Sequence, residues 1–176
     1  VIYRIGDSMP LIARLLNTFD PVADIEDFHR KFELTYDGKP RSLPKDLLEF
    51  RHKFMLEEVD EYRSFAFEAY AEAASGEPDV HHYTHCLEYA LDGLVDGVYV
   101  TLGTSYLHGF DFKEAWRRVH DANMKKVRAL RVEDSKRSST YDVVKPQGWT
   151  PPSHHDLVKE NDVSTKVDKS IVDPVT

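Results

Sequence analysis

Two groups of acidic residues lie within apolar stretches of the sequence, and their carboxylates are the side chains best suited to chemistry. The first group is Glu57, Glu58 and Glu61 in the run FMLEEVDEYRSF, and the second is Asp92 and Asp96 in the run YALDGLVDGVYVTLG. An unpaired carboxylate is costly to bury, so such residues are usually paired or bind a metal. The two groups therefore indicate a divalent-metal site, and with it phosphate chemistry.

The spacing of the first group supports a helix that turns its carboxylates towards apolar neighbours. At about 100° per residue, Glu58 and Glu61 share one stripe with Phe50, Phe54 and Phe65. A solvated acidic face would instead lie opposite that stripe.

The second group occupies a segment that is apolar or small nearly all round, as is typical of a central buried helix. Between Tyr89 and Leu107, Asp92 and Asp96 are the only acidic or basic residues, and they lie one helical turn apart. Gly93 and Gly97 would permit the close approach of a neighbouring helix. Because only the short break GEPD separates the two segments, we expect antiparallel helices whose acidic groups face each other.

Four main helices must position these residues. Asp20 as N-cap and Pro21 at the first position open a helix to about residue 34, and Pro44 opens a second to about residue 75. A third is expected over 80–108, closed by Gly109, and a fourth over 112–130, opened by Asp111. The segment MPLIARLL, residues 9–16, is a candidate for a further short helix. We predict an all-α, four-to-five-helix bundle over residues 1–152, with an irregular polar tail over 153–176.

Composition narrows the function. With 31 acidic and 23 basic residues the net charge is −8, which argues against a nucleic-acid-binding protein. There is no apolar run of about 18 residues, so we expect no membrane span. The single cysteine, Cys86, cannot form an intramolecular disulfide and fits a reducing cytoplasm. No secretory signal is recognisable, so a cytoplasmic location is expected, in a host cell if the protein is phage-encoded.

Three motifs resemble one family. FMLEEVDEY resembles the EExxE helix of the all-α nucleoside triphosphate pyrophosphohydrolases, the MazG-like group. LVDGVYVTLGTSYLHGFDFKEAWRRVHDANMKKV resembles that group's second metal-binding helix, its Gly-Asp turn and its N-x-x-K helix. VVKPQGWTPP is similar to the KPxGW tail of one branch, which includes phage members of the MazZ type.

The resemblance implies an oligomeric helical bundle, a homodimer or homotetramer, with Mg²⁺ or Mn²⁺ at roughly two or three ions per site. By match to the motifs, Glu58, Glu61 and Asp96 become metal ligands, and Glu57 binds a further ion or activates water. Where the family has Glu three residues before the final Asp, this chain has Gly93. Asp92 is the natural substitute, and Glu88 is the reserve candidate.

The resemblance also suggests groups that bind the substrate. It places Asn123 and Lys126, on one face of the fourth helix, at the phosphates or sugar. Lys145 would neutralise a phosphate and Trp149 would close over the site, although a packed tryptophan is an equally good interpretation. Tyr99, on the face of Asp96, is a further candidate, with core packing as its alternative. Trp116 is expected in the core.

The resemblance implies water attack on the α-phosphorus of a nucleoside triphosphate, giving a monophosphate and pyrophosphate. dGTP in a phage purine-modification pathway is one candidate substrate, and dUTP or dCTP house-cleaning is the alternative. The residues do not reveal which base is bound.

Three other interpretations remain open. Glu26-x-x-His29 and Glu49-x-x-His52 have the spacing of a di-iron carboxylate site, but Glu49 lies about 180° from Glu58 around its helix. A non-catalytic nucleotide-binding or assembly protein is a second alternative. The histidines His81, His82 and His85 favour a solvated helix start over a zinc site.

Overall fold

The computed structural model describes residues 19–158 of the chain. Helices make up most of the regular structure of this part and the two strands have only two residues each, which confirms the predicted all-α fold. Its elements are α2 (Pro21–Lys31), α3 (Lys45–Ala73), α4 (Val80–His108), α5 (Phe112–Asn123), the strands β1 (Val127–Arg128) and β2 (Val143–Val144), the 3₁₀ helix η2 (Val132–Asp134) and α6 (His155–Val158). The helix expected over residues 9–16 lies outside the described residues.

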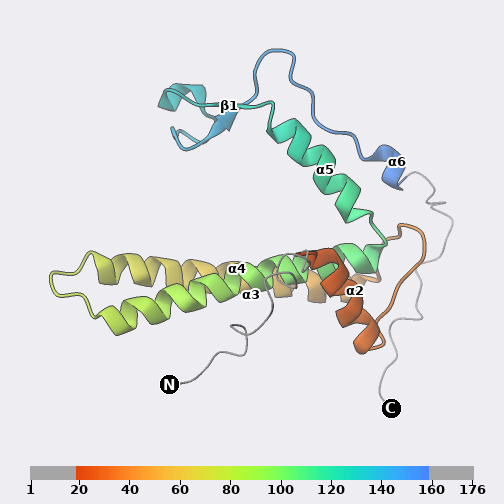
Figure 1. Cartoon of the computed structure of the whole chain (residues 1–176), viewed down its shortest axis with the longest axis horizontal. Coiled ribbons are helices and arrows are strands. Elements are labelled where there is room, and N and C mark those ends of the chain that lie inside the picture. Colours follow the sequence, from red (N-terminus) through yellow and green to blue (C-terminus); the bar gives the residue numbers. More distant parts are fainter. Residues whose placement is uncertain (1–18, 159–176) are drawn as a thin grey trace, which may run out of the picture.

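The frame of the fold is the long antiparallel hairpin of α3 and α4 (Figure 1). Its short connection forms because the Asp79 side chain accepts hydrogen bonds from the His81 and His82 amides at the start of α4. At the other end, Gly109 adopts a left-handed conformation with φ of 70° and stops the helix at His108. The predicted pairing of these two helices, and the predicted bounds of α4, are therefore confirmed.

Helix α2 packs across the end of the hairpin, against α4. Asp20 accepts a hydrogen bond from the Ala23 amide, and Pro21 occupies the first helical position, as predicted. Ile25 and His29 are the buried residues of this helix. The helix ends at Lys31, three residues before the predicted end, and Glu33 then takes a left-handed φ of 58° that redirects the chain.

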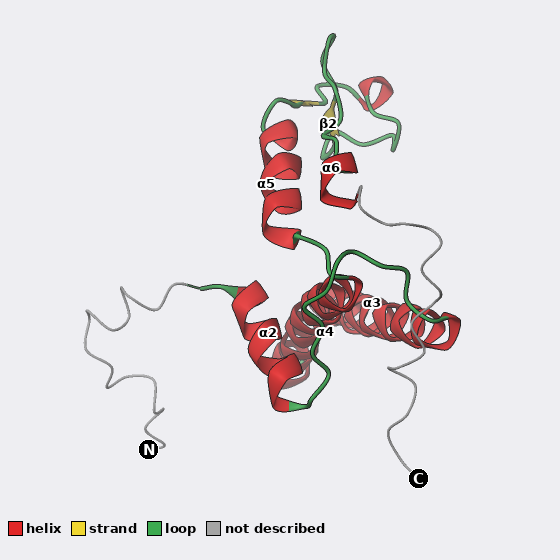
Figure 2. Cartoon of the chain, turned by 90° about the vertical axis from the view of Figure 1, so that its right-hand side faces the viewer, coloured by secondary structure: helices red, strands yellow, loops and turns green. Residues whose placement is uncertain are grey.

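Helix α5 points away from the hairpin, as Figure 2 shows. Asp111 caps it through the Glu114 amide, as predicted, but its predicted end at about residue 130 is wrong. The helix stops at Asn123 because Val127 and Arg128 pair antiparallel with Val144 and Val143. Residues 124–158, here called the arm, therefore form a small β-ribbon with loops.

The arm returns to α5 through one charged contact. Arg118 donates two hydrogen bonds to the Asp156 carboxylate, at 2.6 and 2.7 Å, and a third to the Ser153 carbonyl oxygen. The start of the predicted polar tail, residues 153–158, thus lies on α5 of the same chain.

The expectation that α4 is a buried central helix is wrong for the single chain. Leu91, Leu94 and Val98 are 63%, 51% and 55% exposed. Within residues 19–158, α3 covers one face of α4 and α2 only its C-terminal half, so apolar side chains remain uncovered. None of the described helices is sufficiently long and apolar to cross a membrane.

Candidate active site

Glu58 is the centre of the candidate site. It is a buried residue of α3, only 7% exposed, at the point where α3 meets α4. Burial raises the pKa of the Glu58 carboxyl, and the charges of Asp96, Glu61, Glu57 and Asp92 raise it further, in that order. The five carboxylates that the sequence predicted as metal ligands, here called the acidic patch, therefore lie near enough for the charges of the other four to act on Glu58.

The two helices come this close because α4 carries glycines at the contact. A Cβ built on Gly93 would lie 2.9 Å from the Tyr62 amide nitrogen and 3.2 Å from the Glu58 carbonyl oxygen. A Cβ on Gly97 would meet the Glu58 Cβ at an ordinary contact distance of 3.7 Å. Position 93 is thus filled by backbone packing and has no room for a glutamate side chain. The preceding residue, Asp92, carries a carboxylate whose charge acts on Glu58.

The acidic patch has the chemistry of a site for a hard divalent cation. Within residues 19–158, Lys53 forms an ion pair with Glu57 at 3.5 Å, and no basic side chain pairs with the other four carboxylates. Oxygen donors alone, gathered around one buried carboxyl, are the ligands that Mg²⁺ and Mn²⁺ prefer. A cation bound there would offset the mutual repulsion of these carboxylates.

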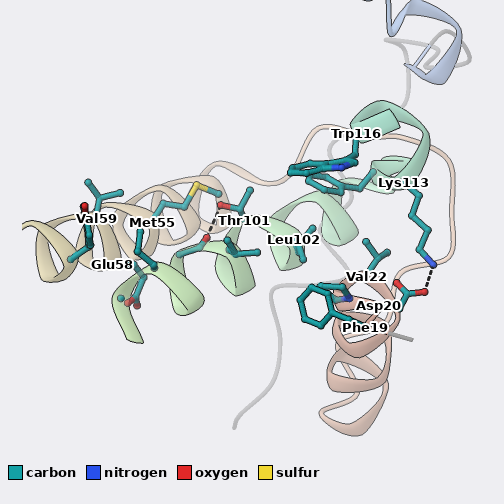
Figure 3. Close-up of a pocket in the computed structure, with 17 residues that line it drawn as sticks. Phe19, Asp20, Val22, Met55, Glu58, Val59, Thr101, Leu102, Lys113 and Trp116 are labelled. Carbon is teal, nitrogen blue, oxygen red and sulfur yellow. Dashed lines mark hydrogen bonds and ion pairs between the residues drawn. The ribbon is translucent and has the colours of Figure 1, made fainter. Parts of the chain in front are cut away.

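The opposite edge of the same hairpin is apolar. Helical geometry places Glu57 and Glu61 on one side of Glu58, and Met55, Val59 and Tyr62 on the other. That second side borders a groove of about 1060 Å³, here called the apolar groove (Figure 3). Its other lining residues come from the start of α2 and from α4 and α5: Phe19, Asp20, Pro21, Val22, Gly93, Leu94, Gly97, Val98, Thr101, Leu102, Phe112, Lys113 and Trp116.

The end of the apolar groove is formed where α5 leaves the hairpin. Lys113 forms an ion pair with Asp20 at 2.6 Å and ties α5 to the start of α2. Trp116, expected in the core, is instead 63% exposed above this groove (Figure 3), because α5 turns away from α4 after its first turn. The sequence did carry a signal for the groove, since α4 is apolar nearly all round and α3 can cover only one of its faces.

A second cluster lies at the far end of α5. The Trp149 indole N–H donates a 2.7 Å hydrogen bond to the Ala122 carbonyl oxygen, and this fixes the KPxGW loop against the helix end. Lys145 and Lys126 place their ammonium groups 4.6 and 5.6 Å from the centre of the Trp149 ring. Asn123 is exposed beside them.

This second cluster corrects one prediction. Asn123 and Lys126 do not share a helix face, because α5 ends at Asn123 and Lys126 lies in the turn that leads to β1. Within the single chain the cluster also stands apart from the acidic patch, since α5 carries it away from the hairpin (Figure 1).

Tyr99 contacts α2 rather than the carboxylates. Its ring packs edge-on against Phe28, with ring centres 5.4 Å apart, and the side chain is 38% exposed. Burial raises the pKa of the Tyr99 hydroxyl, and the charge of Asp24 raises it further.

The two Glu-x-x-His pairs do not come together. His29 is buried, its Nδ1 lies 3.1 Å from the Leu34 carbonyl oxygen, and its ring packs on Tyr106. His52 is exposed on α3. The geometry therefore does not support a di-iron site at these residues.

The fold and the site define an all-α protein whose helical hairpin carries a candidate site for a divalent cation. The model of one family, phosphoribosyl-ATP pyrophosphohydrolase, matches residues 25–123, which is more than half of the chain. The chain belongs to this family, part of the MazG-like all-α superfamily that the sequence motifs indicated. No protein of curated function matches the chain. The match ends where α5 ends, so the arm lies outside it.

Proposed function

We propose that the chain hydrolyses a nucleoside or deoxynucleoside triphosphate to the monophosphate and pyrophosphate, by attack of water on the α-phosphorus. The observation that carries this proposal is the buried Glu58, surrounded by four further carboxylates in a chain of a pyrophosphohydrolase family. A triphosphate is itself strongly negative, so these carboxylates would repel it unless cations lay between them.

The residues have distinct proposed roles. Glu58, Glu61, Asp92 and Asp96 would hold Mg²⁺ or Mn²⁺, and Glu57 would bind a further ion or orient the attacking water. When bound, such an ion supplies Lewis-acid stabilisation of the phosphate charge and a more acidic water molecule. Glu57 suits a role at the edge of the patch, because its side chain is 57% exposed.

The substrate-binding groups of the arm would act on the site of a second copy of the chain. These groups are Lys126, Lys145 and Trp149 of the arm, together with Asn123 at the end of α5. Figure 1 shows that α5 leads away from the hairpin that carries the acidic patch. The apolar groove is open and lined largely by aliphatic and aromatic side chains, so a second hairpin is a better occupant than a charged nucleotide. A homodimer, or a homotetramer built from it, would bury this groove. Tyr99 of α4 would support the substrate pocket through its contact with Phe28 of α2.

The proposal also concerns which nucleobase the substrate carries. We propose dGTP as the first substrate to test, on the similarity of the KPxGW loop to a phage branch, with dUTP and dCTP as the house-cleaning alternatives. The family description adds phosphoribosyl-ATP, another nucleotide triphosphate. A non-catalytic nucleotide-binding or assembly protein is the alternative of another class, because the chain has Gly93 at the position where the resemblance leads us to expect a glutamate ligand.

The test is pyrophosphate release from dATP, dGTP, dCTP, dTTP, dUTP and phosphoribosyl-ATP, with Mg²⁺, with Mn²⁺ and with EDTA. We expect metal-dependent release from one nucleotide, lowered roughly a hundredfold or more in Glu58→Gln and Asp96→Asn. Glu49→Gln is the matched control, because Glu49 lies on the opposite side of α3 in an exposed ion pair with Lys45. Full activity in both carboxylate variants would refute the proposed site. Metal-dependent nucleotide binding without release would favour the non-catalytic alternative.

A further inference from the structure

A group of different ligand types lies near the tip of the hairpin, away from the acidic patch. Glu68 of α3 and His82 and Cys86 of α4 each offer one donor atom, and the three atoms lie within 4.8 Å of one another. His82 and Cys86 are one helical turn apart, so both side chains project from the same face of α4 towards Glu68. The antiparallel pairing of the helices thus assembles three donors from distant parts of the sequence.

The distances suit a transition-metal ion. Nε2 of His82 lies 3.0 Å from Oε1 of Glu68 and 3.7 Å from Sγ of Cys86. Around tetrahedral zinc, bond lengths of about 2.0 to 2.3 Å place neighbouring nitrogen and oxygen donors about 3.4 Å apart, and nitrogen and sulfur donors about 3.6 Å apart. Only small side-chain movements separate the observed arrangement from coordination.

We propose that Glu68, His82 and Cys86 form a zinc-class metal site that links α3 to α4 near the hairpin connection. The mixture of carboxylate, imidazole and thiolate is a donor set for Zn²⁺ or Co²⁺ and not for Mg²⁺. Glu72, one turn beyond Glu68, already accepts a hydrogen bond from the Asp79 amide. Three protein ligands and one water are therefore assigned, and the half-exposed side chains of His82 and Glu68 leave that fourth position open to solvent.

The buried thiol of Cys86 favours zinc-class metal ions over Mg²⁺ at this site. Cys86 is fully buried, so its sulfur is screened from other thiols and faces the imidazole of His82. Burial raises the pKa of this thiol, and the charges of Glu68 and Glu72 raise it further. The thiolate is the form of cysteine that binds metal, so metal binding would release the thiol proton to solvent.

This site differs from the acidic patch in both chemistry and place. The patch offers oxygen donors alone, and Glu68 follows Glu61 by two helical turns along α3. The ion would clamp the end of the hairpin, next to the short connection of residues 74–79, and stabilise the pairing that positions Glu58. The inference does not depend on the proposed hydrolysis.

The experiment is a titration of Co²⁺ into the full-length, chemically reduced protein after metal removal. A thiolate ligand produces a sulfur-to-cobalt charge-transfer absorption, which an all-oxygen site cannot produce. We expect this band to saturate at stoichiometric Co²⁺, to disappear on addition of Zn²⁺, and to be absent in Cys86→Ser. In His82→Gln the affinity should fall more than roughly tenfold.

Two matched variants separate this site from its surroundings. His81→Gln removes the neighbouring histidine of the same helix turn and should leave the band unchanged, because His81 is exposed and outside the cluster. Glu58→Gln should also retain the band while losing pyrophosphate release, so failure of the proposed function and failure of this inference are distinguishable.

A second readout covers variants that fold poorly. Zn²⁺ should raise the Tm of the unmodified protein and of His81→Gln by more than it raises the Tm of His82→Gln. Absence of the charge-transfer band in the reduced unmodified protein would overturn the inference. Persistence of the band in Cys86→Ser would also overturn it.

Discussion

Gly93 of α4 lies directly against the backbone of Tyr62 of α3, so close that an added Cβ would come within 2.9 Å of the Tyr62 amide nitrogen. Because α4 packs against α3 at this point, Asp92 and Asp96 lie near enough to Glu58 for their charges to act on its carboxyl. It also explains why the chain departs from the expected Glu-x-x-Asp spacing, because a side chain at position 93 would separate the helices.

The Gly93 contact predicts that alanine substitutions at Gly93 and Gly97 change the free energy of unfolding differently. Gly93→Ala should lower the free energy of unfolding by about 1–3 kcal/mol, because α3 backbone atoms cannot move aside cheaply. Gly97→Ala should be neutral or stabilising by up to about 1 kcal/mol, since its Cβ finds an ordinary contact of 3.7 Å and alanine favours helix. Denaturant unfolding at one fixed protein concentration measures both. Equal stability of the two variants would contradict the packing described here.

Burial of Glu58 predicts a pH-dependent stability without metal. Its pKa in the folded chain is raised above the ordinary 4.5, so the folded chain holds this proton more tightly than the unfolded chain. The free energy of unfolding therefore falls as pH rises from 4.5 through the raised pKa. Glu58→Gln should be more stable than the unmodified protein above this window and equal to it below.

The quantity to measure is the difference in Tm between Glu58→Gln and the unmodified protein, across a pH series in EDTA. The difference is needed because Arg117 and Arg118 lower the pKa of Glu114 to about 2, and Arg118 lowers that of Asp156 to about 2. Their contribution has the opposite sign: it is present above the ordinary values of 4.5 and 3.8 and is lost as pH falls towards 2. A difference that stays constant with pH would disprove the burial effect, and Mg²⁺ should reverse its sign at neutral pH.

The apolar groove predicts self-association through α4. Leu94→Glu should convert the assembly to monomers, because the interface would have to bury an unpaired carboxylate at a cost of several kcal/mol. Val80→Glu is the matched control, since Val80 is 68% exposed at the start of α4 and outside the groove. Light scattering after size-exclusion chromatography gives the masses. A monomeric unmodified protein, or an unchanged mass for Leu94→Glu, would count against the groove as an interface.

The Trp149 cluster predicts a role in substrate binding that is separable from folding. Lys145→Ala should lower kcat/KM by roughly tenfold, mainly through KM, because it removes a cation available to a phosphate. Lys125→Ala removes an exposed lysine in the turn that follows α5 and should have little effect. With Trp116→Phe as background, Trp149 fluorescence should change on nucleotide binding. If Lys145→Ala and Lys125→Ala behave alike, the arm does not contact the substrate.

Several structural features could be predicted from the sequence because they depend on residues close together in the chain. The starts of α2 and α5 follow from Asp20 and Asp111, whose carboxylates cap amides three residues on. The end of α4 follows from Gly109, since glycine adopts a left-handed conformation without a steric penalty. The proximity of the two acidic groups could also be predicted. The helical period puts each group on one face of its helix, and the six-residue connection forces α3 and α4 to pack against each other.

Other features depend on residues that only folding brings together. Helix α5 stops at Asn123 because Val127 pairs with Val144, a contact that no local pattern records. Trp116 is exposed because α5 leaves the hairpin, and the Asp20–Lys113 ion pair at this point joins residues far apart in the sequence. Glu68, His82 and Cys86 meet only across the hairpin. The sequence by itself determined the helices and their acidic residues, because helix formation depends on short-range geometry. The apolar groove and the Glu68–His82–Cys86 cluster depend on long-range packing, in which small differences in helix crossing decide which side chains meet.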